Sequence, residues 1–226
     1  MSFETALRLT EILLAWALMQ SSVEHLVRAS EQWLFVPRLV LALLLALGVA
    51  PGLASAGLLA HALLVLRRFD GPYNGGSDRM VLLCLICVTA AHWAPVSAWQ
   101  ELALGYLAGQ LVLSYTMSGW VKLRNPDWRS GRALADVFLF SAYPVSEGLR
   151  VYADRQGLLW IGSWGVILFE VFFAVGMVHP MALGAVLTVA AGFHLANACV
   201  FGLNRFFWAW LTAYPSIFWL QDRLIG

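Results

Sequence analysis

The sequence has few charged residues for its length. Of its 226 residues, 12% are charged and 61% are hydrophobic, whereas soluble domains have about 25% charged and about 45–50% apolar residues. So few charges cannot cover a soluble surface of this size, which argues against a cytosolic globular enzyme and against a disordered chain. The 14 basic and 13 acidic side chains nearly cancel, so the basic excess of a nucleic-acid-binding protein is missing. An integral membrane protein remains, with the lipid bilayer as its partner.

Cysteine is also scarce. The three cysteines, Cys84, Cys87 and Cys199, all lie in apolar runs and give no disulfide framework. The spacing of Cys84 and Cys87 is typical of redox pairs, but Val88 follows where covalent haem attachment needs histidine, so buried structural cysteines are predicted. The five histidines include no close pair, and no metal site is expected.

Long apolar runs take the place of charge, and they predict an all-α fold, a polytopic transmembrane bundle. About 20 apolar residues cross a bilayer as a helix, which allows about seven or eight spans here. The expected helices are 5–24, 34–50, 53–67, 80–95, 100–123, 157–178, 181–203 and 206–220.

Two segments differ from a simple apolar span. The apolar block 34–67 is broken only at Pro51-Gly52, so we expect a tight helical hairpin there. The shorter apolar piece 133–145 contains Asp136 and Pro144 and is predicted to be re-entrant or interfacial. Short turns leave no room for a soluble domain, so residues 1–226 are predicted to form a single membrane domain.

The placement of the basic residues supports this layout. With the hairpin, 12 basic side chains fall on one side of the membrane and only Arg8 and Arg223 on the other. Because basic loops stay inside, this predicts a bacterial-type inner or cell membrane protein with cytoplasmic basic loops and external termini.

Ionisable residues within apolar helices are the candidates for chemistry, because they are costly in a bilayer. Lys122 ends an apolar run and shares a helical face with Tyr115 and Ser118. It is either a snorkelling anchor at the end of a span or a desolvated base whose neutral amine accepts a proton.

A second polar group lies further along the chain. His194 and Asn197 share one helix face, and Glu170 lies at similar depth on the preceding helix. Pairing of Glu170 with either Lys122 or His194 is open, and His194 with Asn197 is either a polar site at mid-depth or a hydrogen-bonded pair that joins helices.

Three stretches carry a family resemblance. They are Tyr73–Arg79, Tyr115–Gly131 and Phe193–Phe206, the last followed by Tyr214-Pro215. In this order they resemble the horizontally transferred transmembrane (HTTM) family, which includes the vitamin K-dependent gamma-carboxylases. The resemblance runs from about residue 65 to 220.

The resemblance implies a helical membrane core that holds a quinone or a reduced vitamin K-like molecule. It implies that Lys122 is a catalytic base, since the carboxylases use a lysine in the matching stretch, with Tyr115 orienting it. A His-x-x-Asn stretch of the carboxylases matches His194 and Asn197, which are the implied ligand contacts, and we expect Glu170 and Asn74 to contact the ligand with them. The carboxylases have a histidine where Asn74-Gly75-Gly76-Ser77 stands, which argues against carboxylation of protein glutamates.

Two functions follow as hypotheses. The first is a quinol-dependent oxidation or carboxylation enzyme with Lys122 as base, whose substrate comes from a membrane or peptide partner. The second is a non-catalytic membrane subunit, or a lipid- or quinone-binding module, in which Lys122 anchors a span. Convergence of Lys122, Tyr115, His194 and Glu170 would favour the first.

Overall fold

The computed structural model describes residues 1–69, 75–141 and 145–226, and within them the chain is helical without β-strands. Its α-helices are α1 (Phe3–Leu26), α2 (Gln32–Leu47), α3 (Pro51–Arg68), α4 (Gly75–Trp93), α5 (Ser97–Arg124), α6 (Pro126–Ser130), α7 (Arg132–Phe140), α8 (Gln156–Val171), α9 (Pro180–Phe201), α10 (Asn204–Leu211) and α11 (Tyr214–Ile225). The 3-10 helices are η1 (Ala29–Glu31), η2 (Glu147–Asp154) and η3 (Phe173–Val178). The predicted all-α class is confirmed.

The predicted break in the apolar block 34–67 separates α2 from α3. Helix α2 ends at Gly48, which has a φ of 74°, and Ala50 has a φ of 44° before Pro51 opens α3. Glycine adopts the left-handed conformation without steric cost, and proline suits the first turn of a helix. The two helices pack on each other, so the hairpin prediction is confirmed.

The last predicted helix, 206–220, is wrong as a single element. The structure has α10 and α11 there, separated at Thr212 and Ala213. Pro215 lies in the first turn of α11. It has no N–H to donate, and its ring clashes with the carbonyl four residues earlier, at Leu211, where α10 ends. Segment 157–178 is likewise divided into α8 and η3.

Two helical stretches within the described residues are long and apolar enough to cross a membrane. They are Ala29–Leu47 and Pro180–Phe201. Only 22% of each is buried inside the protein, so most of their apolar side chains point outward, as lipid-facing helices require. Two spans are fewer than the seven or eight that the sequence predicts, and that larger number stays a prediction.

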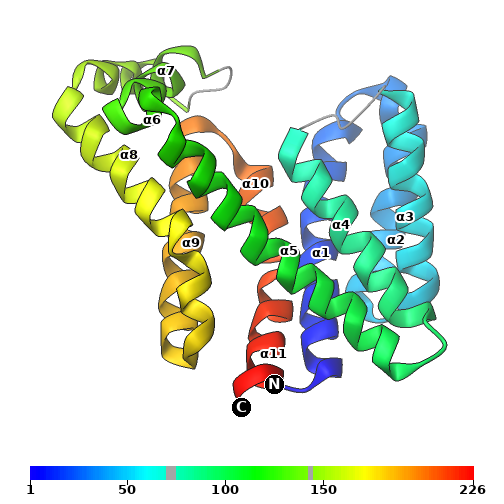
Figure 1. Ribbon diagram of the computed structural model, residues 1–226. Helices are drawn as coiled ribbons and strands as arrows, with labels where there is room; N and C mark the ends of the chain where they lie inside the picture. Colours follow the sequence, from blue (N-terminus) through cyan, green and yellow to red (C-terminus); the bar gives the residue numbers. More distant parts are fainter. Residues whose placement is uncertain (70–74, 142–144) are drawn as a thin grey trace. The chain divides into compact units, whose positions relative to one another are not determined.

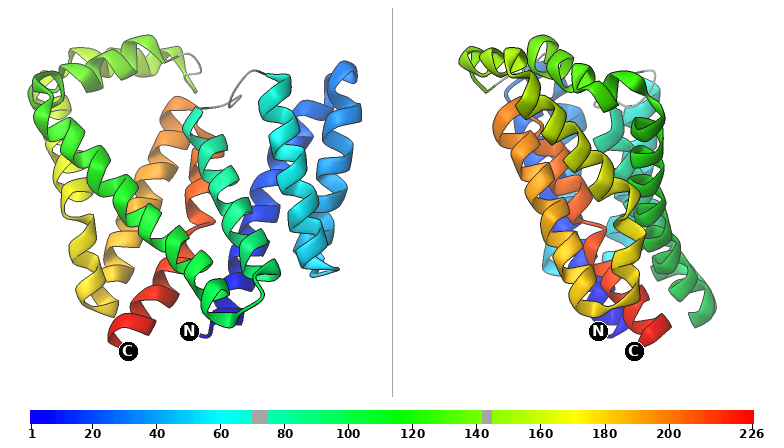
Figure 2. Two further views of the ribbon diagram at one scale, coloured as in Figure 1. Left: turned by 45° about the vertical axis from the view of Figure 1, so that its right-hand side comes forward. Right: turned by 60° about the vertical axis from the view of Figure 1, so that its left-hand side comes forward.

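The chain divides into two compact units. Unit 1 comprises Met1–Gly109, Trp208–Leu224 and Gly226, and unit 2 comprises Gln110–Phe207 and Ile225. In unit 1, α1 packs on α2 and α4, and α3 packs on the same two helices (Figure 1). In unit 2, α8 packs on α6 and α7, which lie across one end of that unit (Figure 2). The prediction of a single domain over residues 1–226 stays a prediction.

Unit 1 contains a buried carboxylate with two partners. Glu11 is 2% exposed; its Oε2 accepts from Arg8 Nη1 at 2.8 Å, and its Oε1 lies 2.5 Å from His92 Nε2. Arg8 also donates to the carbonyls of Leu45, at 2.7 Å, and Ala46 at the end of α2. A buried charge is tolerated when it is paired in this way, and the cluster joins α1, α2 and α4.

A histidine of α3 bonds the backbone of α2 close to the proline inside that helix. Pro37 lacks an N–H, and proline disturbs the helical hydrogen bonds of the carbonyls in the preceding turn. The Leu34 carbonyl lies in that turn and accepts from His61 Nε2 of α3 at 2.8 Å. His61 therefore joins α3 to the backbone of α2 at a carbonyl just before Pro37.

Helix α7 is the predicted short apolar piece 133–145, of which Pro144 lies outside the described residues. Its nine residues measure about 14 Å, which is less than half of a hydrocarbon core about 30 Å thick. Arg150 of η2 donates to the carbonyls of Phe138 and Leu139 at its end, and its guanidinium holds Glu147 through two hydrogen bonds of 2.5 and 3.2 Å.

This anchor predicts acid sensitivity at the end of α7. The hydrogen bond from Arg150 lowers the pKa of Glu147 below its ordinary value of 4.5. Because this pKa is lower in the folded state, the stabilisation is complete above about pH 4.5 and is lost as the pH falls through the lower value. As the pH falls through this lowered pKa, the wild type loses the ion pair. We therefore expect hydrogen exchange of its α7 amides, corrected for intrinsic rates, to become faster in that pH range.

The matched variant is Glu147→Gln, which cannot titrate. Its α7 amides should exchange faster than those of the wild type at neutral pH and show no further step in acid. Identical pH profiles for the two proteins would contradict the assigned role of this pair.

Candidate functional site

Lys122 is the only lysine in the sequence, and unit 2 pairs it with a buried carboxylate. Its Nζ donates to Glu170 Oε2 of α8 at 2.6 Å and to Ser118 Oγ, one turn earlier in α5, at 2.5 Å. The side chain of Lys122 is 15% exposed and that of Glu170 is 4% exposed. Of the two pairings that the sequence leaves open for Glu170, the structure has the one with Lys122.

A glycine brings the two helices of this pair together. A Cβ atom placed on Gly119 would lie 2.5 Å from the Val171 nitrogen and 2.8 Å from the Glu170 carbonyl carbon. Any side chain there would therefore meet the backbone of α8, which has no flexible atom to move aside. Small residues allow this close approach of apolar helices, and here it lets the Lys122 side chain reach Glu170.

A second buried pair lies on the same stretch of α5. Tyr115 Oη is 2.8 Å from His194 Nε2 of α9, and the two residues are 3% and 5% exposed. The Tyr115 ring stacks on Phe173 with a centroid distance of 4.1 Å and meets Phe169 edge-on at 5.6 Å. The phenol is thus fixed by rings on two sides and by an imidazole at its tip.

The two pairs are neighbours along their helices. Tyr115 and Ser118 are three residues apart on α5 and so share a face, and Phe169, which contacts Tyr115, directly precedes Glu170. In these apolar surroundings the lysine and glutamate are stable as a charged pair only with good hydrogen bonds, and Ser118 supplies an additional one. The four predicted residues Lys122, Tyr115, His194 and Glu170 thus lie as two adjacent pairs inside unit 2.

The other predicted ligand contacts are not part of these pairs. Asn197 is half-buried on α9, and its backbone carbonyl accepts from Gly202 and Leu203 at the helix end. Its side chain has no hydrogen bond to the described part of the chain. Asn74 lies outside the described residues. The described residues contain no group of metal-binding side chains, and Cys84 and Cys87 are buried free thiols.

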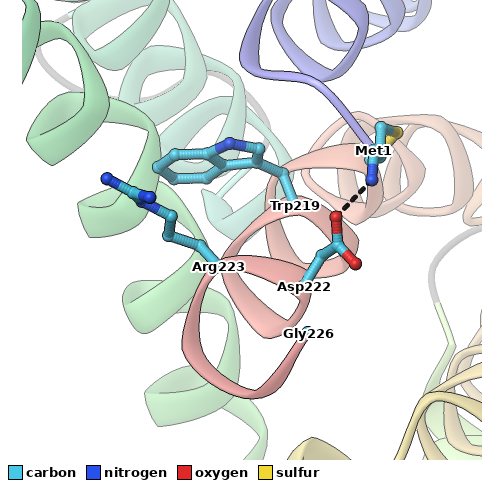
Figure 3. Close-up of a pocket in the computed structure, with 5 residues that line it drawn as sticks. All are labelled: Met1, Trp219, Asp222, Arg223 and Gly226. Carbon is cyan, nitrogen blue, oxygen red and sulfur yellow. Dashed lines mark hydrogen bonds and ion pairs between the residues drawn. The ribbon is translucent and has the colours of Figure 1, made fainter.

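A surface pocket of about 250 Å³ lies elsewhere, in unit 1. It is lined by Met1, Trp219, Asp222, Arg223 and Gly226, and the Met1 amine pairs with the Asp222 carboxylate (Figure 3). None of the predicted site residues lines it. Its partly exposed ion pair carries no chemistry of its own, so the buried pairs of unit 2 remain the candidate site.

The outward-facing apolar side chains of Ala29–Leu47 and Pro180–Phe201 fit a membrane protein, and the residues that the structure describes are helical without β-strands. Residues 84–222 match the family model of the HTTM domain. Because this match covers more than half of the chain, the protein belongs to the HTTM family. The matched region contains both buried pairs. No curated protein and no solved structure gives a significant match to the chain.

Sequence reasoning overlooked part of this site. The aromatic wall of Phe169 and Phe173 was not anticipated, nor was the contact of Trp128 with Lys122, whose Nζ lies 5.1 Å from the indole centroid. The role of Gly119 as a spacer was also missed. Its position one residue after Ser118 in an apolar helix is a usable signal, because small residues in such helices mark close contacts.

Gly119 provides a test of the close approach. We expect Gly119→Ala to destabilise the protein by about 1–3 kcal/mol, since the added methyl overpacks against backbone. The control is Gly165→Ala on α8, where no atom lies within 4 Å of the added Cβ; that variant should gain about 0.5–1 kcal/mol from helix propensity. Thermal unfolding in detergent measures both, and equal effects would argue against the contact.

The ion pair itself predicts strong non-additivity. Glu170→Leu or Lys122→Met alone leaves an uncompensated buried charge and should cost about 3–5 kcal/mol each. The double variant removes both charges and should return close to wild-type stability. A double-mutant cycle of unfolding free energies measures this coupling, and simple addition of the two losses would show that the charges do not interact.

Proposed function

We propose that the chain spans the membrane about seven or eight times as one domain. Besides the two stretches that pass the test of length and composition, α1 and α5 are about 36 and 42 Å long, enough to cross a bilayer. The outward-facing apolar side chains of these helices support this, among them Leu102, at 68% exposed, and Val121, at 60%. With the charge distribution of the sequence, the basic loops face the cytoplasm.

We propose further that unit 2 is a gamma-carboxylase-like proton-transfer site that binds a quinol. The observation that carries this proposal is the single lysine of the chain, held inside an apolar bundle by a buried glutamate. A snorkelling anchor would extend to the membrane surface, whereas this ammonium is directed at Glu170 of the neighbouring helix. Membrane proteins keep such costly groups where they serve function.

The side chains present fit a quinol. Tyr115 and His194 offer a hydroxyl and an imidazole that can hydrogen-bond a hydroxyl group, and Phe169 and Phe173 offer ring faces. Because Tyr115 and His194 now bond each other, they must exchange that bond for bonds to the ligand. A quinol, when bound, supplies two hydroxyl protons together with two electrons.

Lys122 must be a neutral amine to accept one of these protons. Transfer of one proton from Nζ to Glu170 Oε2, 2.6 Å away, converts the charged pair to an amine and a carboxylic acid without changing the total charge. The amine then takes a proton from a hydroxyl group, and Glu170 keeps the proton that it received.

The alternative is a non-catalytic membrane subunit or a lipid- or quinone-binding module. The observation that favours it is the set of bonds between these polar groups. Lys122 bonds Glu170 and Ser118, and Tyr115 bonds His194, as polar groups that join helices do. In that case a positive charge at position 122 would be sufficient, whatever its ability to give up a proton.

The substitution Lys122→Arg separates these functions, because arginine keeps the charge but stays protonated. With menadiol as the probe, we expect oxygen-dependent oxidation by the wild-type protein in detergent and a loss of about 10²–10⁴-fold in Lys122→Arg. Arg124→Lys is the control on the same helix and should keep the wild-type rate.

Two other results would argue against a catalytic Lys122. Saturable menadiol binding without oxidation in any variant would favour the quinone-binding module. Equal oxidation rates for the wild type and Lys122→Arg, with both proteins folded by circular dichroism, would contradict the role of Lys122 as a base.

A further inference from the structure

Helix α6 is short, and its start and end are defined by residues that favour helix termini. Asn125 caps its start by accepting the Asp127 N–H at 2.9 Å, and Pro126 occupies its first turn. It ends at Gly131, which has a φ of 85°, a conformation that favours glycine. Five residues do not form a stable helix by themselves, so other parts of unit 2 must hold it in place.

Helix α8 supplies that support. The Trp164 indole donates to the Arg129 carbonyl at 3.1 Å, and the Gln156 amide donates to the Ser130 carbonyl at 2.9 Å. A Cβ on Gly131 would lie 2.9 Å from the backbone nitrogen of Trp160, so the backbone at the end of α6 is in close contact with that of α8. The helix that carries Glu170 therefore also fixes the orientation of α6.

The side chain that α6 brings to the site is Trp128. Lys122 Nζ lies 5.1 Å from the centroid of its indole ring, within the range of a cation–π contact. Ser118 and Glu170 occupy two further directions around the same nitrogen. The Lys122 side chain is 15% exposed in these surroundings.

We propose that Trp128 is a positioning residue that covers Lys122 and limits its access to water. With Trp128 in place, the ammonium exchanges its proton with Glu170 or with a bound ligand more readily than with bulk solvent. Only the reference to a ligand rests on the proposed function. The shielding itself follows from the contacts of Trp128, α6 and α8.

The single lysine makes the shielding directly measurable. A water-soluble amine reagent such as trinitrobenzenesulfonate can modify just one side chain of this kind, and mass spectrometry gives its rate. The ratio of the rates in protein unfolded with urea and dodecyl sulfate and in folded protein defines the protection of Lys122. We expect Trp128→Leu to reduce this protection about tenfold, which lies between the effects of an exposed and of a fully desolvated cation–π contact.

The control is Trp120→Leu. Trp120 lies on α5 and is 45% exposed, and the Arg124 guanidinium lies 4.7 Å from its ring centroid. It therefore matches Trp128 in residue type and in cation–π contact, but it does not cover Lys122. Trp120→Leu should keep wild-type protection.

The conservative variant Trp128→Phe keeps an aromatic face and should recover most of the protection. It also decides the case if Trp128→Leu does not fold. Wild-type protection in a folded Trp128→Leu protein, or full loss in a folded Trp128→Phe protein, would overturn the proposal. The modification assay needs no turnover. If the wild-type protein shields Lys122 as expected but does not oxidise menadiol, the result counts against the proposed function and not against the role of Trp128.

Discussion

The ion pair between Lys122 and Glu170 is the constraint on which the rest of unit 2 depends. An ammonium or a carboxylate alone is too costly in an apolar bundle, so each needs the other at hydrogen-bond distance. This requires α5 and α8 to lie almost backbone to backbone, which Gly119 permits because it has no side chain. The same two helices then fix the Tyr115 phenol and the Trp128 indole around the pair.

In unit 1 too, buried charges are paired at hydrogen-bond distance, but without a lysine. Its buried carboxylate, Glu11, is shared by Arg8 and His92, and Arg38 reaches the hydroxyls of Ser21 and Ser22 on α1. These groups join helices and satisfy the carbonyls at helix ends, so a structural role is enough to explain their presence. The site in unit 2 differs because its cation is the one lysine of the chain, a group that can be neutral as well as charged.

The helices could be predicted from the sequence because apolar runs and prolines act locally. The break before Pro51 was predicted correctly, whereas the break at Pro215 was missed because the apolar run continues across it. The candidate residues were found because a charge within an apolar run is conspicuous. Their pairing could not be predicted, since it depends on Gly119, Trp128 and Phe173, whose side chains carry no charge and whose roles arise only when separate helices pack.

The measurement that tests this account most directly is the contact between the lysine nitrogen and the glutamate carboxyl group. Protein labelled with ¹⁵N-lysine and ¹³C-glutamate has only one lysine Nζ signal, because Lys122 is the only lysine. Solid-state NMR dipolar recoupling in lipid bilayers should show coupling of this nitrogen to one carboxyl carbon, as the 2.6 Å contact requires, and Glu170→Gln should abolish it. No coupling to any glutamate carboxyl would contradict the account.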